Sequence, residues 1–175
     1  MCPNRLLPTG SDWLEWRYND DERGHIMKLA LASDHAGYPL KQHLVDYLRK
    51  HGHDIIDLGV DTDAVRVDYS DAAKKVGQAV VDRKAERGIL VCGSGVGASI
   101  AANKIKGVYC AITHDAYSAA QGVEHDNMNI MALGSKIVGV AVAERLADAF
   151  ISATFLTEPD RYMRRFKQVQ DMEQS

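Results

Sequence analysis

The stretch from Ile89 to Asn103, I-L-V-C-G-S-G-V-G-A-S-I-A-A-N, constrains the fold more than any other part of the chain. Its apolar residues predict a buried strand that stops at Cys92. The strand leads into an alanine-rich helix through a loop that contains Gly93, Gly95 and Gly97. Such a unit directs backbone N–H groups and the positive end of a helix dipole at one point. We therefore expect an anion to bind there and the Cys92 thiol to be shifted toward the thiolate.

The composition indicates one domain that acts on small molecules. The 175 residues are 46% hydrophobic and 26% charged, which allows a substantial core. The net charge of −3, without a lysine or arginine block, favours neither nucleic acid nor a membrane surface as a partner. Three cysteines cannot all pair within one chain, and no apolar run reaches membrane-spanning length. We expect a cytoplasmic protein.

Residues 1–26 differ from the rest of the chain. They show neither strand alternation nor a sustained helical stripe, and they lack the cationic start and apolar core of a signal peptide. We expect a poorly ordered or adventitious extension before a domain at residues 27–175, because Met27 begins a strand at once. The alternative is that Trp13, Trp16 and Tyr18 dock on a partner subunit.

The remaining chain alternates predicted strands with predicted helices. Strands are expected at 28–33, 55–58, 89–92, 108–113 and 129–133. Helices are expected from Pro39 to Gly52, from about Tyr69, from Val96 to Asn103, from His114-Asp115 to about Glu124, at 140–154, and after Pro159. The helix at 140–154 should have Val142 on its apolar side. The last helix should direct Tyr162, Phe166, Val169 and Met172 inward.

This alternation predicts an α/β fold. It is typical of a single-domain, doubly wound, Rossmann-like or flavodoxin-like sheet of five parallel strands with helices on both faces and a C-terminal helix. We expect the strand order 2-1-3-4-5. Ligands bind beyond the carboxyl ends of such strands, which places Asp34, His35 and His114-Asp115 on the same edge as the glycine loop.

Several candidate residues also have structural explanations. Cys92 could be a small core hydrophobe, and Asp34 with His35 could cap the first helix. Cys110 lies mid-strand, as a core residue would. The pair His51 and His53 lacks a third ligand, so no metal site is predicted. The glycine loop has neither the lysine of a P-loop nor the spacing of a dinucleotide fingerprint.

The combined motifs closely resemble type B ribose 5-phosphate isomerases, a family that includes the subunits of galactose 6-phosphate isomerase. The resemblance spans about residues 27–172. Its motifs are S-D-H-A-G-Y at 33–38, D-Y at 68–69, C-G-S-G-V-G at 92–97, A-A-N-K at 101–104, Y-S-A at 117–119, G-S-K-I-V-G at 134–139, and the pair Arg161 and Arg165. The resemblance implies aldose–ketose isomerisation of a sugar phosphate through a cis-enediolate, without metal or cofactor, in a homodimer with shared sites or a dimer of dimers.

The resemblance also implies a role for individual residues. Cys92 would move the proton between C2 and C1, and Ser94 would relay protons between O1 and O2. Some family members instead carry a glutamate at the position of Ala98. His125 would open the sugar ring, with Asp34 nearby. The other expected substrate contacts are the N–H groups of Gly93, Gly95 and Gly97 on the enediolate, His35, Arg161 and Arg165 on the phosphate, Tyr69 along the sugar, and Asp126 and Lys136.

Four departures from the family pattern leave the substrate open. Asp126 replaces a usual asparagine, Tyr162 a histidine, Tyr109 a common arginine, and Lys136 an arginine that often helps to bind phosphate. Ribose 5-phosphate is the expected substrate, and a tetrose or hexose phosphate is the alternative. A non-catalytic sugar-phosphate sensor would not need the Cys92 thiol, and a phospho-acceptor domain would need an acidic cluster in place of the glycines.

The direction of the chain predicts that two subunits share each site. Cys92 ends a strand, whereas His125 comes after a helix and before the next strand, on the opposite edge of a parallel sheet. One strand length, ~17–20 Å, would separate them. A two-fold partner is therefore expected to supply His125.

Overall fold

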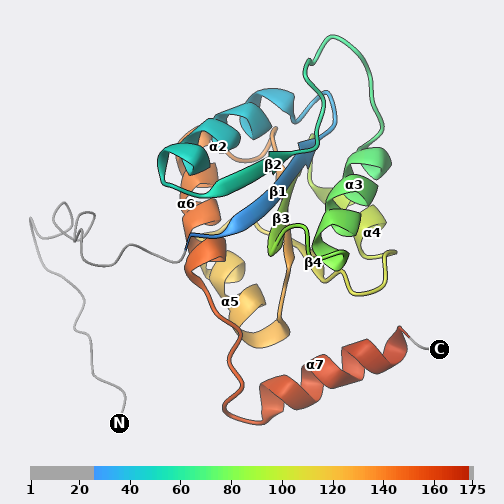
Figure 1. Cartoon of the computed structure of the whole chain (residues 1–175), viewed down its shortest axis with the longest axis vertical. Helices are drawn as coiled ribbons and strands as arrows, with labels where there is room; N and C mark the ends of the chain where they lie inside the picture. Colours follow the sequence, from blue (N-terminus) through green and yellow to red (C-terminus); the bar gives the residue numbers. More distant parts are fainter. Residues whose placement is uncertain (1–25, 174–175) are drawn as a thin grey trace, which may run out of the picture.

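A computed structural model of the chain describes residues 26–173 (Figure 1). The predicted extension at residues 1–26 therefore lies, except for Ile26, outside the described residues, as does the alternative that its aromatic residues dock on a partner. From Met27 onward the chain forms alternating strands and helices, and the predicted α/β fold is confirmed.

The described elements follow one another in the predicted sequence. They are β1 (Lys28–Ser33), α2 (Tyr38–Lys50), β2 (Asp54–Asp57), α3 (Tyr69–Val81), β3 (Arg87–Cys92), α4 (Val96–Ala102), β4 (Cys110–Ile112), α5 (Ala116–Asp126), β5 (Ile130–Gly134), α6 (Val140–Ser152) and α7 (Arg161–Met172). Helix α5 continues two residues beyond the expected Glu124, so His125 and Asp126 lie in its last turn.

All neighbouring strands of the five-stranded sheet are parallel, and their order is β2-β1-β3-β5-β4. The expected order 2-1-3-4-5 was wrong at the far edge. Every residue of β5 is buried, whereas β4 is three residues long and only partly buried. A fully buried apolar strand is more stable between two neighbours, and a short, partly exposed strand suits an edge.

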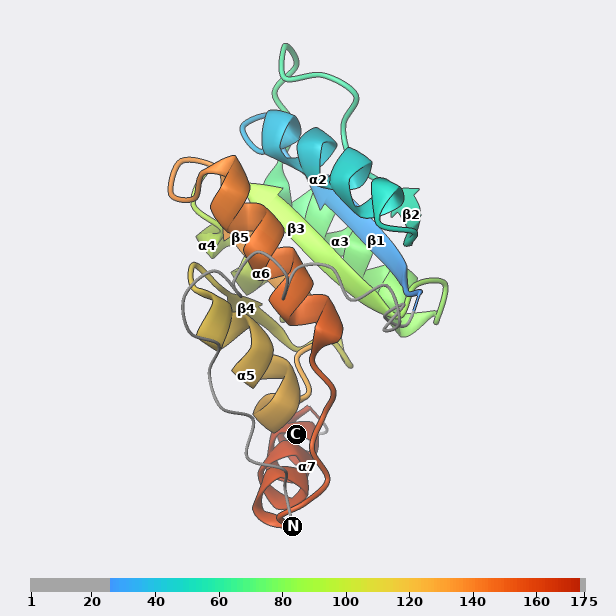
Figure 2. The same cartoon turned by 90° about the vertical axis from the view of Figure 1, so that its left-hand side faces the viewer.

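Helices cover both faces of the sheet (Figure 2). Leu29 and Leu31 of β1 face α2, α5 and α6, while Ala30 and Ala32 face α3 and α4. Strand β3 alternates in the same way and places Cys92 on the alanine-rich α3/α4 side. No helix within residues 26–173 is both long and apolar enough to cross a membrane.

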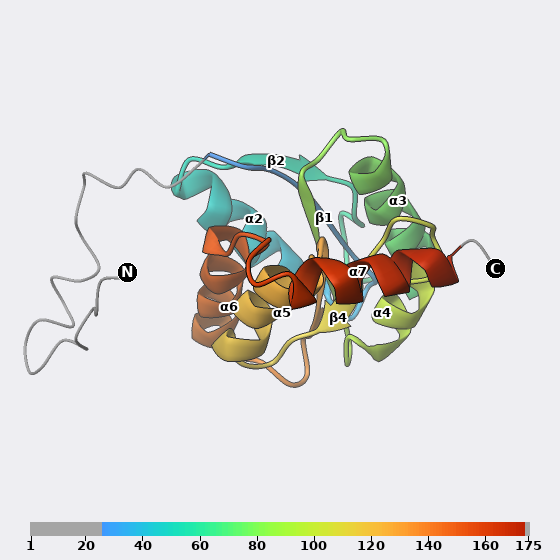
Figure 3. The same ribbon diagram turned by 90° about the horizontal axis from the view of Figure 1, so that it is seen from below.

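Two of the predicted helix faces were partly wrong. The buried residues of α6 are Ala143, Leu146, Ala147 and Phe150, so Val142, which is 45% exposed, lies one position off the buried stripe. On α7, Tyr162 is buried, but Val169 and Met172 are 46% and 73% exposed. Helix α7 lies beyond the amino-terminal edge of the sheet and packs on α5, which leaves much of its apolar face uncovered (Figures 1 and 3).

An ion pair between a buried lysine and a partly exposed aspartate joins α2 to the end of β2. The Lys41 side chain is 0% exposed, and its Nζ donates to both carboxylate oxygens of Asp57 at 2.8 and 2.7 Å and to the carbonyl of Val60 at 3.2 Å. The ammonium is thus fully neutralised and hydrogen-bonded inside the protein, as a buried charge requires.

Replacing Asp57 by Ala should lower the free energy of unfolding by about 3 kcal/mol, because it leaves the buried ammonium without a counter-charge. Urea denaturation measures this loss. Lys41→Met is the matched control, since it removes the charge but keeps a long apolar chain, and it should cost less than half as much. Equal losses in the two variants would show that the pair contributes packing rather than charge compensation.

Candidate active site

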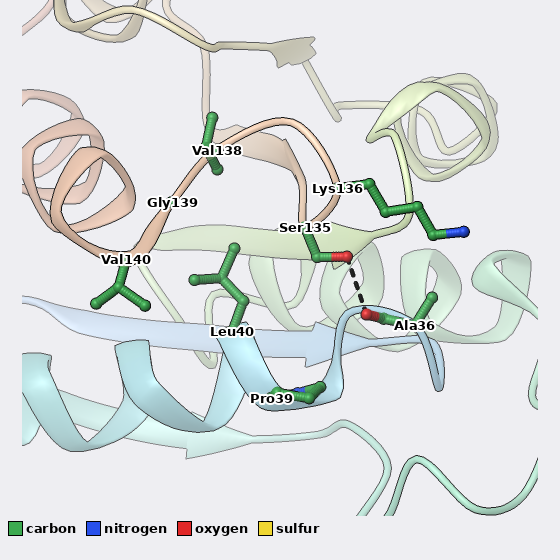
Figure 4. Close-up of a pocket in the computed structure, with 8 residues that line it drawn as sticks. All are labelled: Ala36, Pro39, Leu40, Ser135, Lys136, Val138, Gly139 and Val140. Carbon is green, nitrogen blue, oxygen red and sulfur yellow. Dashed lines mark hydrogen bonds between the residues drawn. The ribbon is translucent and has the colours of Figure 1, made fainter.

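Loops that follow β1, β3 and β5 meet at the carboxyl-terminal edge of the sheet. Ser135 N–H donates to Cys92 O at 2.8 Å, and Lys136 N–H donates to Gly93 O at 3.1 Å. The Ser135 hydroxyl donates to Ala36 O at 2.9 Å and so joins the third loop (Figure 4). These bonds fix the glycine loop from two sides before any substrate contributes.

The glycine loop directs a backbone N–H group at the thiol. Cys92 is buried, and its Sγ accepts from Gly95 N–H at 3.0 Å. Gly95 has φ +82°, a left-handed conformation that side chains disfavour, and α4 begins directly after it. Of the glycine amides expected to contact the enediolate, this one therefore contacts the Cys92 sulfur instead.

Asp34 and His35 hold the neighbouring loops. Asp34 is buried, and its Oδ1 accepts from Gly37 N–H at 2.9 Å, which closes the turn between β1 and α2. His35 Nδ1 lies 3.3 Å from Val67 O and 3.4 Å from Val67 N, in the loop before α3. Asp34 thus has a structural role at this edge, and His35 contacts the loop before α3 through Nδ1.

Tyr69 packs directly on the glycine loop. A Cβ atom on Gly97 would lie 2.7 to 2.9 Å from three atoms of the Tyr69 ring, so only glycine permits this contact. Tyr69 is nevertheless 46% exposed, and the rest of its ring can contact a ligand. The structure therefore places Tyr69 beside the loop of Cys92 and Ser94.

A hollow of about 410 Å³ lies beside these loops, between the starts of α2 and α6 (Figure 4). It shares Ala36 and Lys136 with the site, but Cys92 does not line it. Its other lining residues are Pro39, Leu40, Ser135, Val138, Gly139 and Val140. Because this lining is largely aliphatic, the polar loops around Cys92 are better suited to a phosphorylated sugar.

The remaining predicted site residues form a second cluster at the opposite edge. The His125 ring stacks on Tyr162, with centroids 4.2 Å apart and planes inclined by 15°. Gln121 Nε2 donates to His125 Nδ1 at 2.8 Å and lies 3.5 Å from a carboxylate oxygen of Asp126. Arg161 Nη2 donates to the Tyr162 hydroxyl at 2.8 Å. Arg165 follows one turn later on α7 and is exposed.

The register of the sheet shows why the clusters do not meet within one chain. Cys92 pairs with Gly134 at the end of β5, whereas His125 precedes Ile130, where β5 begins. At about 3.3 Å per residue, β5 alone separates the two levels by roughly 13 Å. Asp34 therefore lies with Cys92 and away from His125, and the two would be neighbours only across a subunit boundary.

Gln121 and the contact of His35 with Val67 were not predicted from the sequence. The contact of His35 depends on which distant segments pack together, and such packing leaves no local pattern. Gln121 could have been found from its spacing to His125, because residues four apart share a helix face.

The chain matches the Ribose/Galactose Isomerase family over residues 29–169. It belongs to this family. It is 37% identical over 149 residues to ribose-5-phosphate isomerase B of Escherichia coli, covering 85% of this chain and 98% of the relative. It is 35% identical over 130 residues to D-erythrulose-4-phosphate isomerase of Pectobacterium atrosepticum, covering 74% and 86%. The solved ribose-5-phosphate isomerase B of Clostridium thermocellum superposes with a TM-score of 0.81 at 38% identity, over 85% and 98% of the chains.

Membership in the Ribose/Galactose Isomerase family makes the protein a sugar-phosphate isomerase. Two of its departures have clear structural explanations. Tyr109 packs edge-on against Phe166 with centroids 4.8 Å apart and helps to fasten α7, and burial raises the pKa of its hydroxyl. Tyr162 takes part in the stack on His125. Asp126 and Lys136 are exposed, and nothing in the structure explains their replacement.

Gly97→Ala should displace the Tyr69 ring and raise KM about tenfold, because overpacking of this kind costs about 1–3 kcal/mol. Steady-state kinetics with the family's sugar phosphates measures this change in KM. Gly139→Ala is the matched control, because a Cβ there meets nothing within 4 Å. Equal KM values for the two variants would show that the contact between Tyr69 and Gly97 does not shape the site.

Proposed function

We propose that the protein interconverts ribose 5-phosphate and ribulose 5-phosphate with Cys92 as the base. The observation that carries this proposal is the hydrogen bond from Gly95 N–H to Cys92 Sγ at the centre of the loop site. This bond fixes the sulfur at the end of β3, beside Ser94 and the glycine amides of the same loop. A base held in place next to the groups that would contact the substrate is what proton transfer requires.

The proton transfers follow from this arrangement. The Cys92 thiolate takes the proton from C2 of the open-chain aldose, and negative charge develops on O1. Ser94 carries the O2 proton to O1, the thiol returns its proton to C1, and the ketone forms at C2. The N–H groups of Gly93 and Gly97 stabilise the enediolate oxygens, which lowers the barrier by about 3 kcal/mol for one such donor.

His125 opens the sugar ring in the same proposal. The Gln121 side-chain amide lies 2.8 Å from His125 Nδ1 and so occupies that edge of the ring, which leaves Nε2 as the atom for the sugar. In its imidazolium form His125 gives the Nε2 proton to the ring oxygen and is left as the neutral imidazole. The phosphate is held by His35 together with Arg161 and Arg165, whose guanidinium groups form charge-assisted bonds to phosphate oxygens.

These two groups of residues require a homodimer with shared sites. Cys92 and His35 lie at one edge of the sheet, and His125 and Arg161 lie at the other. Exposed apolar residues on two helices support the presence of a partner chain. They are Val96 and Ile100 on α4 and Met163, Val169 and Met172 on α7. A two-fold arrangement would cover these surfaces and complete two equivalent sites.

The choice of ribose 5-phosphate rests on the match to nearly the whole length of the Escherichia coli relative. The relative named for D-erythrulose 4-phosphate is of comparable identity and supports a tetrose phosphate as the second candidate. The distance between the base and the phosphate-binding groups should match the carbon chain of only one of these sugars. The two substrates should therefore differ in kcat/KM.

An isomerase assay over ribose 5-phosphate, erythrose 4-phosphate and a six-carbon aldose phosphate tests the substrate. Ribose 5-phosphate should give the highest kcat/KM, and free ribose should be turned over poorly, since it lacks the charged group that His35 and the arginines bind. A higher kcat/KM for the tetrose or hexose phosphate would reassign the substrate. Binding without turnover of any sugar phosphate would indicate a sensor.

Cys92→Ala should lower kcat on the order of 10²–10⁴-fold, the usual contribution of a positioned base. Binding of the sugar phosphate, measured by calorimetry, should remain, because the loop amides and arginines do not depend on the thiol. Cys110→Ala is the matched control. Burial raises the pKa of the Cys110 thiol to about 12, so this cysteine remains protonated at neutral pH and should not matter for rate. A Cys92→Ala enzyme with a tenth of the wild-type rate would exclude Cys92 as the base.

A further inference from the structure

Tyr162 connects the histidine and the arginine of the second cluster. Its ring lies nearly parallel to the His125 ring, with centroids 4.2 Å apart. Its hydroxyl accepts a hydrogen bond from Arg161 Nη2 at 2.8 Å, and the Arg161 guanidinium carbon lies 4.7 Å from the ring centroid. One side chain therefore contacts both groups through different atoms.

Tyr162 is well suited to hold its neighbours in place. Among the described residues of α7 it is the buried one, with 6% exposure, so α7 is anchored at this position. His125 lies at the fraying end of α5, where the helix itself restrains a side chain least. Tyr162 restrains one face of the imidazole, and the Gln121 amide fixes Nδ1. Together these contacts determine where the Nε2–H group points.

We propose that Tyr162 is a positioning residue that aligns ring opening with phosphate binding. Its ring orients His125, and its hydroxyl orients Arg161. The inference rests on the proposed function, in which His125 opens the sugar ring and Arg161 binds the phosphate. It adds that Tyr162 fixes His125 and Arg161 relative to each other. The distance from the phosphate to the ring oxygen is then set by a rigid side chain.

The chemistry of the substrates separates the two parts of this role. Ribose 5-phosphate closes a five-membered ring when O4 adds to C1, and this ring must open before C2 can lose its proton. Ribulose 5-phosphate has its carbonyl at C2, and closing a five-membered ring would need O5, which carries the phosphate. It reacts as the open chain. Loss of ring opening therefore lowers kcat from ribose 5-phosphate relative to kcat from ribulose 5-phosphate.

Three substitutions at Tyr162 distinguish its ring from its hydroxyl. Tyr162→Phe keeps the stack and removes the bond to Arg161, so KM for both sugar phosphates should rise about 3- to 10-fold while both kcat values stay within about twofold. Tyr162→Leu removes the stack, so the ratio of the two kcat values should fall about 10-fold or more, the effect of a misplaced catalytic group. Tyr162→His restores a flat ring without the hydroxyl, so it should recover the kcat ratio but not KM.

Two reference variants complete the experiment. His125→Ala gives the kcat ratio expected when ring opening is lost. Phe166→Leu weakens the edge contacts of α7 with Tyr109 and Phe155 but leaves the stack of Tyr162 on His125 intact. It should therefore change kcat from the two sugar phosphates by the same factor. If Tyr162→Leu does not fold, two comparisons still decide the question. The KM of Tyr162→Phe is compared with that of wild type, and the kcat ratio of Tyr162→His is compared with that of His125→Ala.

The inference is overturned if Tyr162→Leu or Tyr162→His lowers both kcat values equally, or if Tyr162→Phe leaves KM unchanged. These outcomes leave the proposed function intact when wild type turns over both sugars and His125→Ala lowers the kcat ratio. If His125→Ala lowers both directions equally, its ring-opening role is wrong and the inference falls with it. If wild type turns over neither sugar, the proposed function itself fails.

Discussion

The common direction of the strands is the constraint on which the rest of the structure depends. In a parallel sheet every strand ends at the same edge, so residues that follow strands gather there and residues that precede strands gather at the other edge. Cys92 and His35 belong to the first group, and His125 belongs to the second. No adjustment of side chains brings them together, because a full strand separates them. A chemistry that needs both groups therefore needs two chains.

Close packing around β3, the strand that ends at Cys92, helps to keep the glycine loop in place. A Cβ atom on Gly88 would lie 2.3 Å from Val76 of α3, and one on Gly37 would lie 2.3 Å from Val91 O. The missing side chains let α3 and the first loop approach β3 directly. Strand β3 is thus held closely by α3 near its start and by the first loop near its end, which is the kind of rigidity that a preorganised site for an enediolate requires.

Local sequence patterns predicted most of this fold but not its long-range details. Strand β1 was predicted with its observed bounds because an apolar run between polar residues is a local signal. The order of β4 and β5 was wrong because it depends on which strand is more fully covered by helices from elsewhere in the chain. The exposure of Val169 was missed because an amphipathic pattern shows which face is apolar and does not show what covers it.

The candidate site shows the same division. The glycine loop was predictable, because its residues adjoin in the sequence, but the bond from Gly95 N–H to Cys92 Sγ depends on how the loop turns back on the end of β3. The stack of Tyr162 on His125 joins residues of two helices, and it became visible only in three dimensions. In the sequence, Tyr162 is only a departure from the family pattern.

The most direct test of shared sites is to mix two inactive proteins, Cys92→Ala and His125→Ala, under conditions in which subunits exchange. If each site combines Cys92 of one chain with His125 of the other, a mixed dimer contains one intact site. Activity should then reappear at up to about a quarter of the wild-type rate for random pairing. Mixing Cys92→Ala with His35→Ala, two substitutions at the same edge, should restore nothing. If subunits are shown to exchange and the Cys92→Ala and His125→Ala mixture stays inactive, both residues act within one chain and the account is contradicted.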